Sequence, residues 1–102
     1  MISRLWHGWT TYANADAYEQ LLRSEVLPGI HRVNGFKGAH LLRRDNKDEV
    51  EFVTLTLFDS LAAVKEFAGE DYELAVVPAQ ARKLLSRFDA RSAHYETVFR
   101  LD

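Results

Sequence analysis

Four segments of the chain have the residue pattern of β-strands, with frequent aromatic and β-branched side chains between polar boundaries. The first includes Leu5–Thr10, and the last spans about Arg91–Arg100. Between them, Phe36–Arg43 and Glu51–Phe58 are joined by the short polar run Asp45–Asp48. So short a connection predicts an antiparallel hairpin.

The segment after the first strand predicts a helix that begins at Ala15, with Asn14 as its N-cap. We expect this helix to kink or end near Leu27, because the residue before a proline such as Pro28 avoids the α conformation. Its apolar stripe, at helical spacing, consists of Tyr18, Leu21, Leu22 and Val26.

A second helix is predicted over Leu61–Ala68. Ser60 supplies a capping hydroxyl for its first turn, and Gly69 suits the left-handed conformation in which many helices end. A third helical pattern starts at Pro78, which fits the first position of a helix, and continues to Phe88.

The main elements follow the order β-α-β-β-α-β, the ferredoxin-like arrangement of an α+β domain with a four-stranded antiparallel sheet. We expect one domain over residues 1–102, with strand one between strands three and four. Two helices cover only one face of such a sheet, so the other face is expected to meet a second copy in a homodimer. The apolar residues expected on that exposed face are Trp6, Phe36, Phe52, Phe58 and Val98.

Composition excludes several classes of function. The net charge is −2 and no basic block extends beyond Arg43-Arg44, so we expect no nucleic-acid partner. The absence of cysteine excludes disulfides, iron–sulfur clusters and a cysteine nucleophile. No charged-then-apolar leader opens the chain, and no apolar run approaches the roughly 18 residues that cross a bilayer. We therefore expect a cytoplasmic protein with no membrane partner.

The first strand places both tryptophans and one of the four histidines around Gly8. Successive side chains of a strand point to opposite faces, so Trp6 shares a face with Gly8, and His7 shares the other with Trp9. A glycine inside a strand often marks a close approach by another group. We expect this strand to form the floor of a ligand site.

Four groups of residues carry a resemblance to a known family: the strand Trp6-His7-Gly8, the turn Val33–Ala39, the junction Thr56–Leu61 with Phe67 after it, and the closing His94-Tyr95-Glu96. Together they resemble the antibiotic biosynthesis monooxygenase (ABM) domains of the dimeric α+β barrel superfamily, over nearly the whole chain. That family includes cofactor-independent oxygenases of polycyclic phenols, haem-degrading enzymes and members with no known activity. Fold alone does not choose among them.

The haem-degrading branch has an aromatic residue at the end of strand three, an asparagine on strand one and an iron-binding histidine after the second helix. Phe58 occupies the first position here, but strand one contains no asparagine and Tyr72–Val77 contains no histidine. The resemblance therefore disfavours haem degradation. Nucleotide-binding motifs are also absent, so we expect no cofactor.

His7 and His94 are the candidate catalytic pair. Strands one and four are expected to be antiparallel neighbours, so the two imidazoles approach each other if register and faces agree. Histidine exchanges protons near neutral pH, and an ionised phenol or enol gives an electron to dioxygen without a metal or flavin. His7 is the expected acid/base group and His94 its partner. For either residue alone, a structural hydrogen bond is the alternative.

A metal site is a further alternative, since His7, His94 and Glu96 supply the two imidazoles and one carboxylate that suit iron. No local metal-binding motif supports that site, so no metal is assigned.

Aromatic residues are the candidate substrate-binding groups, because a planar ligand stacks on aromatic rings. The candidates are Trp9, Tyr95, Tyr12 and Tyr72, of which the first two are expected to orient the ring. Trp6 is expected to pack in the core or a dimer interface. Arg4 and Arg44 are candidates for holding an anionic group, with a solvated or paired surface role as the alternative.

The sequence predicts an ABM-like protein that binds a small aromatic molecule. As an enzyme it would be a cofactor-independent monooxygenase acting on an aromatic or enolisable substrate. The alternative is a non-catalytic ligand-binding or interaction module. The two differ in whether His7 lies in an enclosed pocket.

Overall fold

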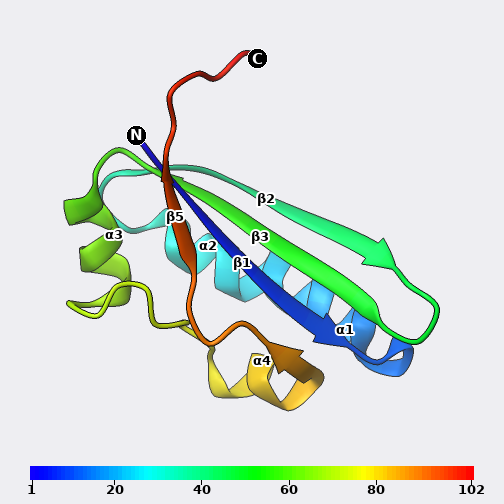
Figure 1. Cartoon of the computed structure of the whole chain (residues 1–102). Coiled ribbons are helices and arrows are strands. Elements are labelled where there is room, and N and C mark those ends of the chain that lie inside the picture. Colours follow the sequence, from blue (N-terminus) through cyan, green and yellow to red (C-terminus); the bar gives the residue numbers. More distant parts are fainter.

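The computed structural model describes all 102 residues. Its sheet contains five antiparallel strands, whereas four were expected. They are β1 (Ile2–Thr10), β2 (Phe36–Asp45), β3 (Val50–Phe58), β4 (Leu85–Phe88) and β5 (Ala93–Glu96). The order is β2-β3-β1-β4, and β5 also pairs with β1 (Figure 1). β1 therefore lies inside the sheet, next to β3, as predicted.

The expected last strand is replaced by two short strands on the same edge of β1. β4 pairs with the end of β1, from Gly8 to Thr10, and β5 pairs with its beginning, from Ile2 to Leu5. Asp89 follows β4 directly in the chain, and its N–H donates to the carbonyl of His7 at 3.0 Å. This hydrogen bond keeps the connection to β5 beside β1.

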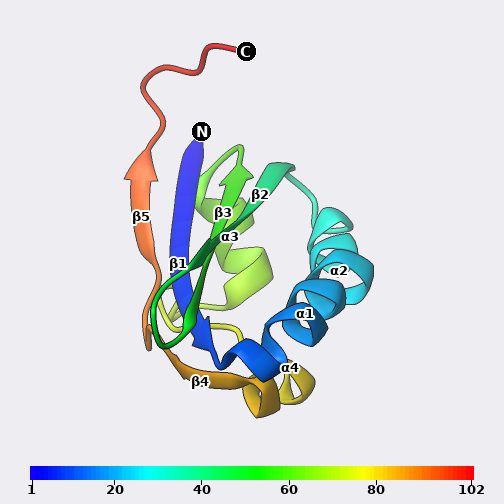
Figure 2. The ribbon, with the colours of Figure 1, turned by 90° about the vertical axis from the view of Figure 1, so that its right-hand side faces the viewer.

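All helices lie on one face of the sheet, and the opposite face is uncovered (Figure 2). They are α1 (Tyr12–Leu21), the π-helical segment η1 (Leu22–Val26), α2 (Leu27–His31), α3 (Leu61–Ala68) and α4 (Ala79–Leu84). After β5, the C-terminal residues extend away from the sheet (Figures 1 and 2). None of the helices has the length and apolar character needed to span a membrane.

The first helix begins earlier than predicted. It starts at Tyr12, and its N-cap is Thr11, whose hydroxyl accepts a hydrogen bond from the N–H of Asn14 at 3.2 Å. Asn14 lies inside the helix, where its side-chain amide donates to the carbonyl of Leu84. Both residue types are good caps, and Thr11 is the one that directly follows the strand.

Near Leu27, where a kink or an end was predicted, the helix does not end, because helical structure continues through α2 to His31. Pro28 lies in the first turn of α2, where its missing N–H costs little. The wider π-helical turn of η1 comes immediately before it. The helix therefore changes its hydrogen-bond spacing next to the proline and does not stop.

The second helix agrees with its prediction. α3 spans Leu61–Ala68, the hydroxyl of Ser60 accepts from the N–H of Ala63, and Gly69 has φ of 91°. The third helical pattern is only half right: α4 ends at Leu84, and Leu85–Phe88 form β4. Strand pairing with β1 overrides the local helical pattern there.

The prediction of which residues the open face exposes is wrong. Phe52 and Phe58 are fully buried in the core beneath the helices, and Val98 lies in the C-terminal tail beyond the sheet. Direct cross-strand partners share a face, and His7 opposes Val53, which in turn opposes Leu42. The open face therefore carries Leu5, His7, Trp9, Leu42, Val53, Leu55 and Tyr95.

Candidate functional site

A cavity lies between the helix-covered face of the sheet and the helices. Its volume is about 60 Å³, and it is partly open to solvent. Its floor is formed by Arg4 and Trp6 of β1 together with Thr54 and Thr56 of β3. The rest of its lining comes from the helices and the later loops: Tyr18, Leu22, Val26, Ile30, Phe67, Val76, Val77, Pro78, Ala81 and Ser92.

Gly8 provides the space in which the Trp6 indole lies. A Cβ at position 8 would lie 3.1 Å from Cη2 and Cζ3 of Trp6 and 2.9 Å from Cδ2 of Leu85. The indole Nε1 donates to the carbonyl of Asp89 at 2.7 Å, and the ring packs against Phe88 at a centroid distance of 5.8 Å. Trp6 is therefore a fixed wall of the cavity, and strand one forms part of its floor.

Arg4 is a buried cation at the cavity, with 5% of its surface exposed. Its Nη1 donates to the carbonyl of Tyr72 at 2.6 Å, its Nη2 to the carbonyl of Leu74 at 3.4 Å, and its guanidinium lies 5.4 Å from the centre of the Phe67 ring. Burial lowers the pKa of Arg4 to about 10, so it is charged at neutral pH. No carboxylate forms a salt bridge with it.

His94 lies behind Arg4, at the register position opposite it on β5. Its Nε2 is 3.0 Å from Nη1 of Arg4. A guanidinium only donates, so Nε2 accepts this bond and the proton of the neutral ring is on Nδ1. Burial, followed by the positive charge of Arg4, lowers the pKa of His94, against a smaller opposite effect of Glu73. His94 is thus a neutral acceptor that orients the guanidinium.

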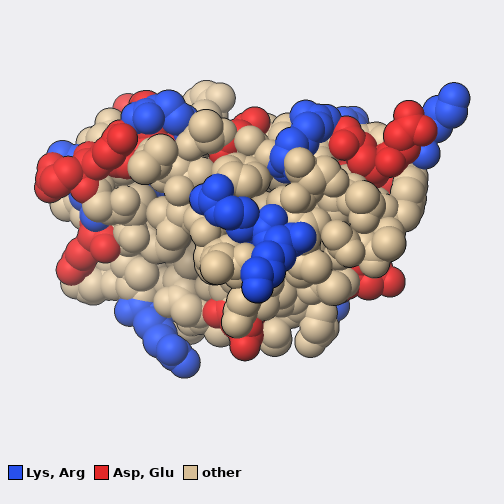
Figure 3. All heavy atoms as spheres, turned by 90° about the horizontal axis from the view of Figure 1, so that it is seen from below, with Lys and Arg blue, Asp and Glu red and all other residues tan.

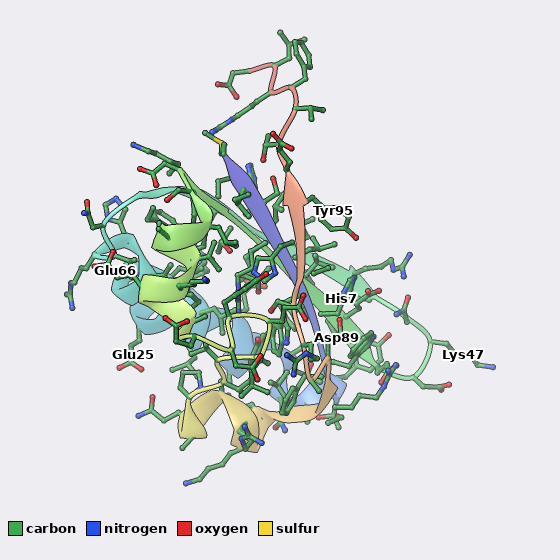
Figure 4. The ribbon with its side chains drawn as sticks, turned by 60° about the vertical axis from the view of Figure 1, so that its left-hand side comes forward. His7, Glu25, Lys47, Glu66, Asp89 and Tyr95 are labelled. Carbon is green, nitrogen blue, oxygen red and sulfur yellow. The ribbon has the colours of Figure 1, made fainter.

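His7 lies on the opposite face of the sheet, outside the cavity. Its Nδ1 is 2.9 Å from Oδ2 of Asp89, and its Nε2 is 3.8 Å from Oε2 of Glu51. Its ring stacks on Trp9 at 5.9 Å. Figure 4 shows His7, Asp89 and Tyr95 on the side of the sheet away from Glu25, which projects from the helix layer.

The structure therefore does not bring His7 and His94 together. β5 reaches only Ile2–Leu5 of β1, and its register sets His94 against Arg4, so the two imidazoles occupy opposite faces. The alternative metal site with Glu96 does not form either, because no three potential ligands of the chain gather at one point.

The four aromatic residues predicted to bind substrate are all absent from the cavity lining. Trp9 and Tyr95 lie on the open face, and Tyr12 is half exposed at the start of α1. Tyr72 packs edge-on against His94, at a centroid distance of 5.1 Å. Their role in substrate binding stays a prediction, because none of the four side chains lines the cavity.

Trp6 lines the cavity although its sequence position predicted only packing, and Thr54, Thr56 and Ser92 line it without having been predicted. The sequence did contain a signal for Trp6, because Gly8 shares a face with it and leaves space beside it. Arg4, named as a candidate anion-binding residue, also lies on that face.

The cavity lining offers no good ligand for haem iron. It contains no histidine, cysteine or carboxylate. Its one phenol, Tyr18, is buried, which raises its pKa well above the usual value and keeps it protonated. The residues that line the cavity therefore do not fit a haem.

A ferredoxin-like α+β sheet with a cavity beneath its helices defines the class of protein. Within this class, the family model described as antibiotic biosynthesis monooxygenase matches residues 9–79. The chain belongs to the ABM family. A search of curated protein sequences finds no match.

Solved structures with a similar fold have low sequence identity to the chain. A Bacillus cereus protein assigned to the antibiotic biosynthesis monooxygenases is 13% identical, with a TM-score of 0.70 and coverage of 99% of this chain and 96% of that one. The Mycobacterium tuberculosis haem-degrader MhuD, with two haems in its active site, is 16% identical, with a TM-score of 0.64 and full coverage of both chains. The Streptomyces coelicolor monooxygenase ActVA-Orf6, in complex with nanaomycin D, is 15% identical, with a TM-score of 0.64 and coverage of 98% and 89%.

Proposed function

We propose that the chain binds a planar, mainly apolar small molecule in the cavity between the sheet and the helices. The observation that carries this proposal is the lining, in which nine of 14 residues are hydrophobic and one buried cation, Arg4, interrupts the apolar surface. A mainly apolar cavity with few polar groups is typical of small-molecule sites. Charges of both signs are interspersed over the face shown in Figure 3.

The chemistry we propose is cofactor-independent monooxygenation of an aromatic or enolisable substrate. In a balanced form, a CH2 group next to the ring system becomes a carbonyl. One atom of dioxygen enters that carbonyl, and the other leaves as water with the two hydrogens. The substrate supplies all four electrons. Arg4 stabilises the electron-rich substrate anion that donates the first of them.

The non-catalytic alternative also has a specific observation in its favour. No carboxylate or imidazole lines the cavity, so the protein supplies no general base there. A substrate must then lose its proton to water or enter already ionised. A receptor for a small molecule needs no such group.

Oxygen uptake distinguishes these functions. A panel of quinols and flavonoids is first screened for thermal stabilisation, and bound compounds are tested for oxygen consumption. The enzyme proposal expects uptake that falls at least tenfold in Arg4→Gln and persists in Arg23→Gln, a matched change at an exposed residue of η1. Binding without uptake would support the receptor, and no binding by any compound would contradict both.

We also propose that a second copy of the chain covers the open face of the sheet. This face is apolar at Leu5, Trp9, Leu42, Val53 and Leu55, and no helix lies over it (Figure 2). Leu42 is 50% exposed and Tyr95 57%. Two such faces pack as a sheet-on-sheet interface, which removes this apolar surface from water.

A further inference from the structure

Arg4 is the one buried arginine, and its charge is not balanced by a carboxylate; Arg32 and Arg82 also lack a carboxylate partner but are exposed to water. Six arginines at the surface each pair with a carboxylate: Arg23, Arg43, Arg44, Arg87, Arg91 and Arg100. Arg4 is buried, and its acceptors are two backbone carbonyls and one imidazole, none of which carries a negative charge. A buried charge without a counter-charge is costly, which favours an anion beside it.

From this imbalance we infer that the ligand binds as an anion, with a carboxylate or ionised phenol oxygen held by Arg4 at the floor of the cavity. The inference deepens the proposed function and rests on it, because it names the chemical class of molecule that the same cavity takes.

The guanidinium has donors left for such a group. Of its five N–H groups, Nη1 uses two, for Tyr72 and His94, and Nη2 uses one for Leu74. The Nε–H and one Nη2–H have no acceptor. Donors on one planar guanidinium match the two oxygens of a carboxylate, and a single phenolate oxygen is also able to accept from them.

Ser92 supplies a second polar group at the cavity. It is 5% exposed, and its Oγ is buried without a hydrogen-bond partner although the residue lines the cavity. A buried hydroxyl without a partner is unusual in folded proteins. An anionic group in the cavity would give Arg4 its counter-charge, and its oxygens are acceptors of the kind this hydroxyl lacks.

His94 acts in this arrangement as a positioning residue. Its Nε2 accepts one Nη1–H of Arg4, and it holds the guanidinium without neutralising its charge. A carboxylate in the same place would supply the counter-charge internally and remove the reason for an anionic ligand.

The test compares ligands of matched shape and different charge. Binding of 1-naphthoate and its neutral amide, 1-naphthamide, is measured by calorimetry at pH 7.5, with 2,4-dinitro-1-naphthol as a phenol ionised at that pH. The wild-type protein is expected to bind at least one of the two anions about tenfold or more tightly than the amide. Which anion binds identifies the oxygen group.

Arg4→Gln is expected to weaken the preferred anion about tenfold to a hundredfold and to leave the amide within about twofold. Arg23→Gln is the matched control and should change neither affinity. Arg4→Lys keeps the charge but loses the planar set of donors, and an intermediate loss is expected. Should Arg4→Gln fail to fold, Arg4→Lys and the wild-type ratio of affinities still decide the question.

Equal affinities for the anions and the amide would contradict the inference that the ligand is an anion. They would still agree with the proposed binding of a small molecule in the cavity. A preference for the anion that is as large in Arg4→Gln as in the wild type, or as large in Arg4→Lys should Arg4→Gln not fold, would overturn the role of Arg4. Failure of all three compounds to bind would contradict both the inference and the proposed function.

Discussion

At the scale of single residues, the cavity wall depends on the indole of Trp6 lying beside Gly8, which has no Cβ. The Trp6 indole occupies space that a Cβ at Gly8 would enter, and its N–H is fixed by the carbonyl of Asp89. The alternation of strand residues predicted correctly that Trp6 shares a face with Gly8 and that His7 shares a face with Trp9. It did not predict which face the helices cover, because both faces carry aromatic residues.

Gly8→Ala should destabilise the protein by about 1–3 kcal/mol, because the new methyl group meets Trp6 and Leu85 at 2.9–3.1 Å. Thermal and urea unfolding measure the change. Gly29→Ala is the matched control: nothing lies within 4 Å of its added Cβ, and alanine favours the helix by up to about 1 kcal/mol. Equal effects of both substitutions would contradict the close contact at Gly8.

The lowered pKa of His94 predicts a loss of stability in mild acid. Its pKa is about 6.5 in the unfolded chain and lower in the folded protein, so below pH 6.5 the unfolded chain binds a proton that the folded protein excludes. The contribution of His94 is complete above about pH 6.5 and declines as the pH falls toward the folded value.

Urea unfolding between pH 7.5 and 5 measures this dependence. His94→Gln, which keeps an acceptor for Arg4, should reduce the decline, whereas His31→Gln at an exposed residue of α2 should not. A decline that is the same in wild type and His94→Gln would contradict the assignment.

At the scale of elements, local signals predicted what local chemistry decides. The β2–β3 hairpin and α3 follow from a short polar turn, a capping serine and a glycine with positive φ. The local pattern did not decide between a kink and an end at Pro28, and it did not predict β4. The pairing of Leu85–Phe88 with β1 joins distant parts of the chain and leaves no signal in the local pattern.

Ser60→Ala should cost about 1 kcal/mol, since it removes the hydroxyl that accepts from the N–H of Ala63 at the start of α3. Ser24→Ala is the comparison, because the Ser24 hydroxyl donates to the Gln20 carbonyl on an exposed helical surface and caps no helix. Its effect should stay within about 0.5 kcal/mol. Urea unfolding of the two variants gives the difference, and a larger loss in Ser24→Ala would contradict the cap.

At the scale of the whole molecule, the sheet separates two environments. One face holds the cavity, with Arg4, Trp6 and the neutral His94 near it. The other is uncovered and carries His7 between Asp89 and Glu51, with Trp9 against the guanidinium of Arg87 at 3.9 Å. The sequence predicted an apolar open face but assigned several core residues to it, because the fold order does not tell which strand residues point toward the helices.

Light scattering tests the proposed homodimer. The expected mass is twice the 11.7 kDa of one chain, and Leu42→Lys on the open face should shift it toward a single chain. Leu61→Lys makes the same change at an exposed residue of α3 and should leave the mass unchanged. A wild-type mass of one chain at micromolar concentration would contradict the dimer.

The central claim is that ligand binds on the face of the sheet that carries Trp6 and not on the face that carries Trp9. Each tryptophan gives one indole N–H signal in a ¹H–¹⁵N spectrum, and the variants Trp6→Phe and Trp9→Phe assign the two. During titration with the tighter-binding naphthalene anion, the Trp6 signal should shift progressively and the Trp9 signal should remain in place. A shift of the Trp9 signal with the Trp6 signal unchanged would contradict the account and return the site to His7 and the open face.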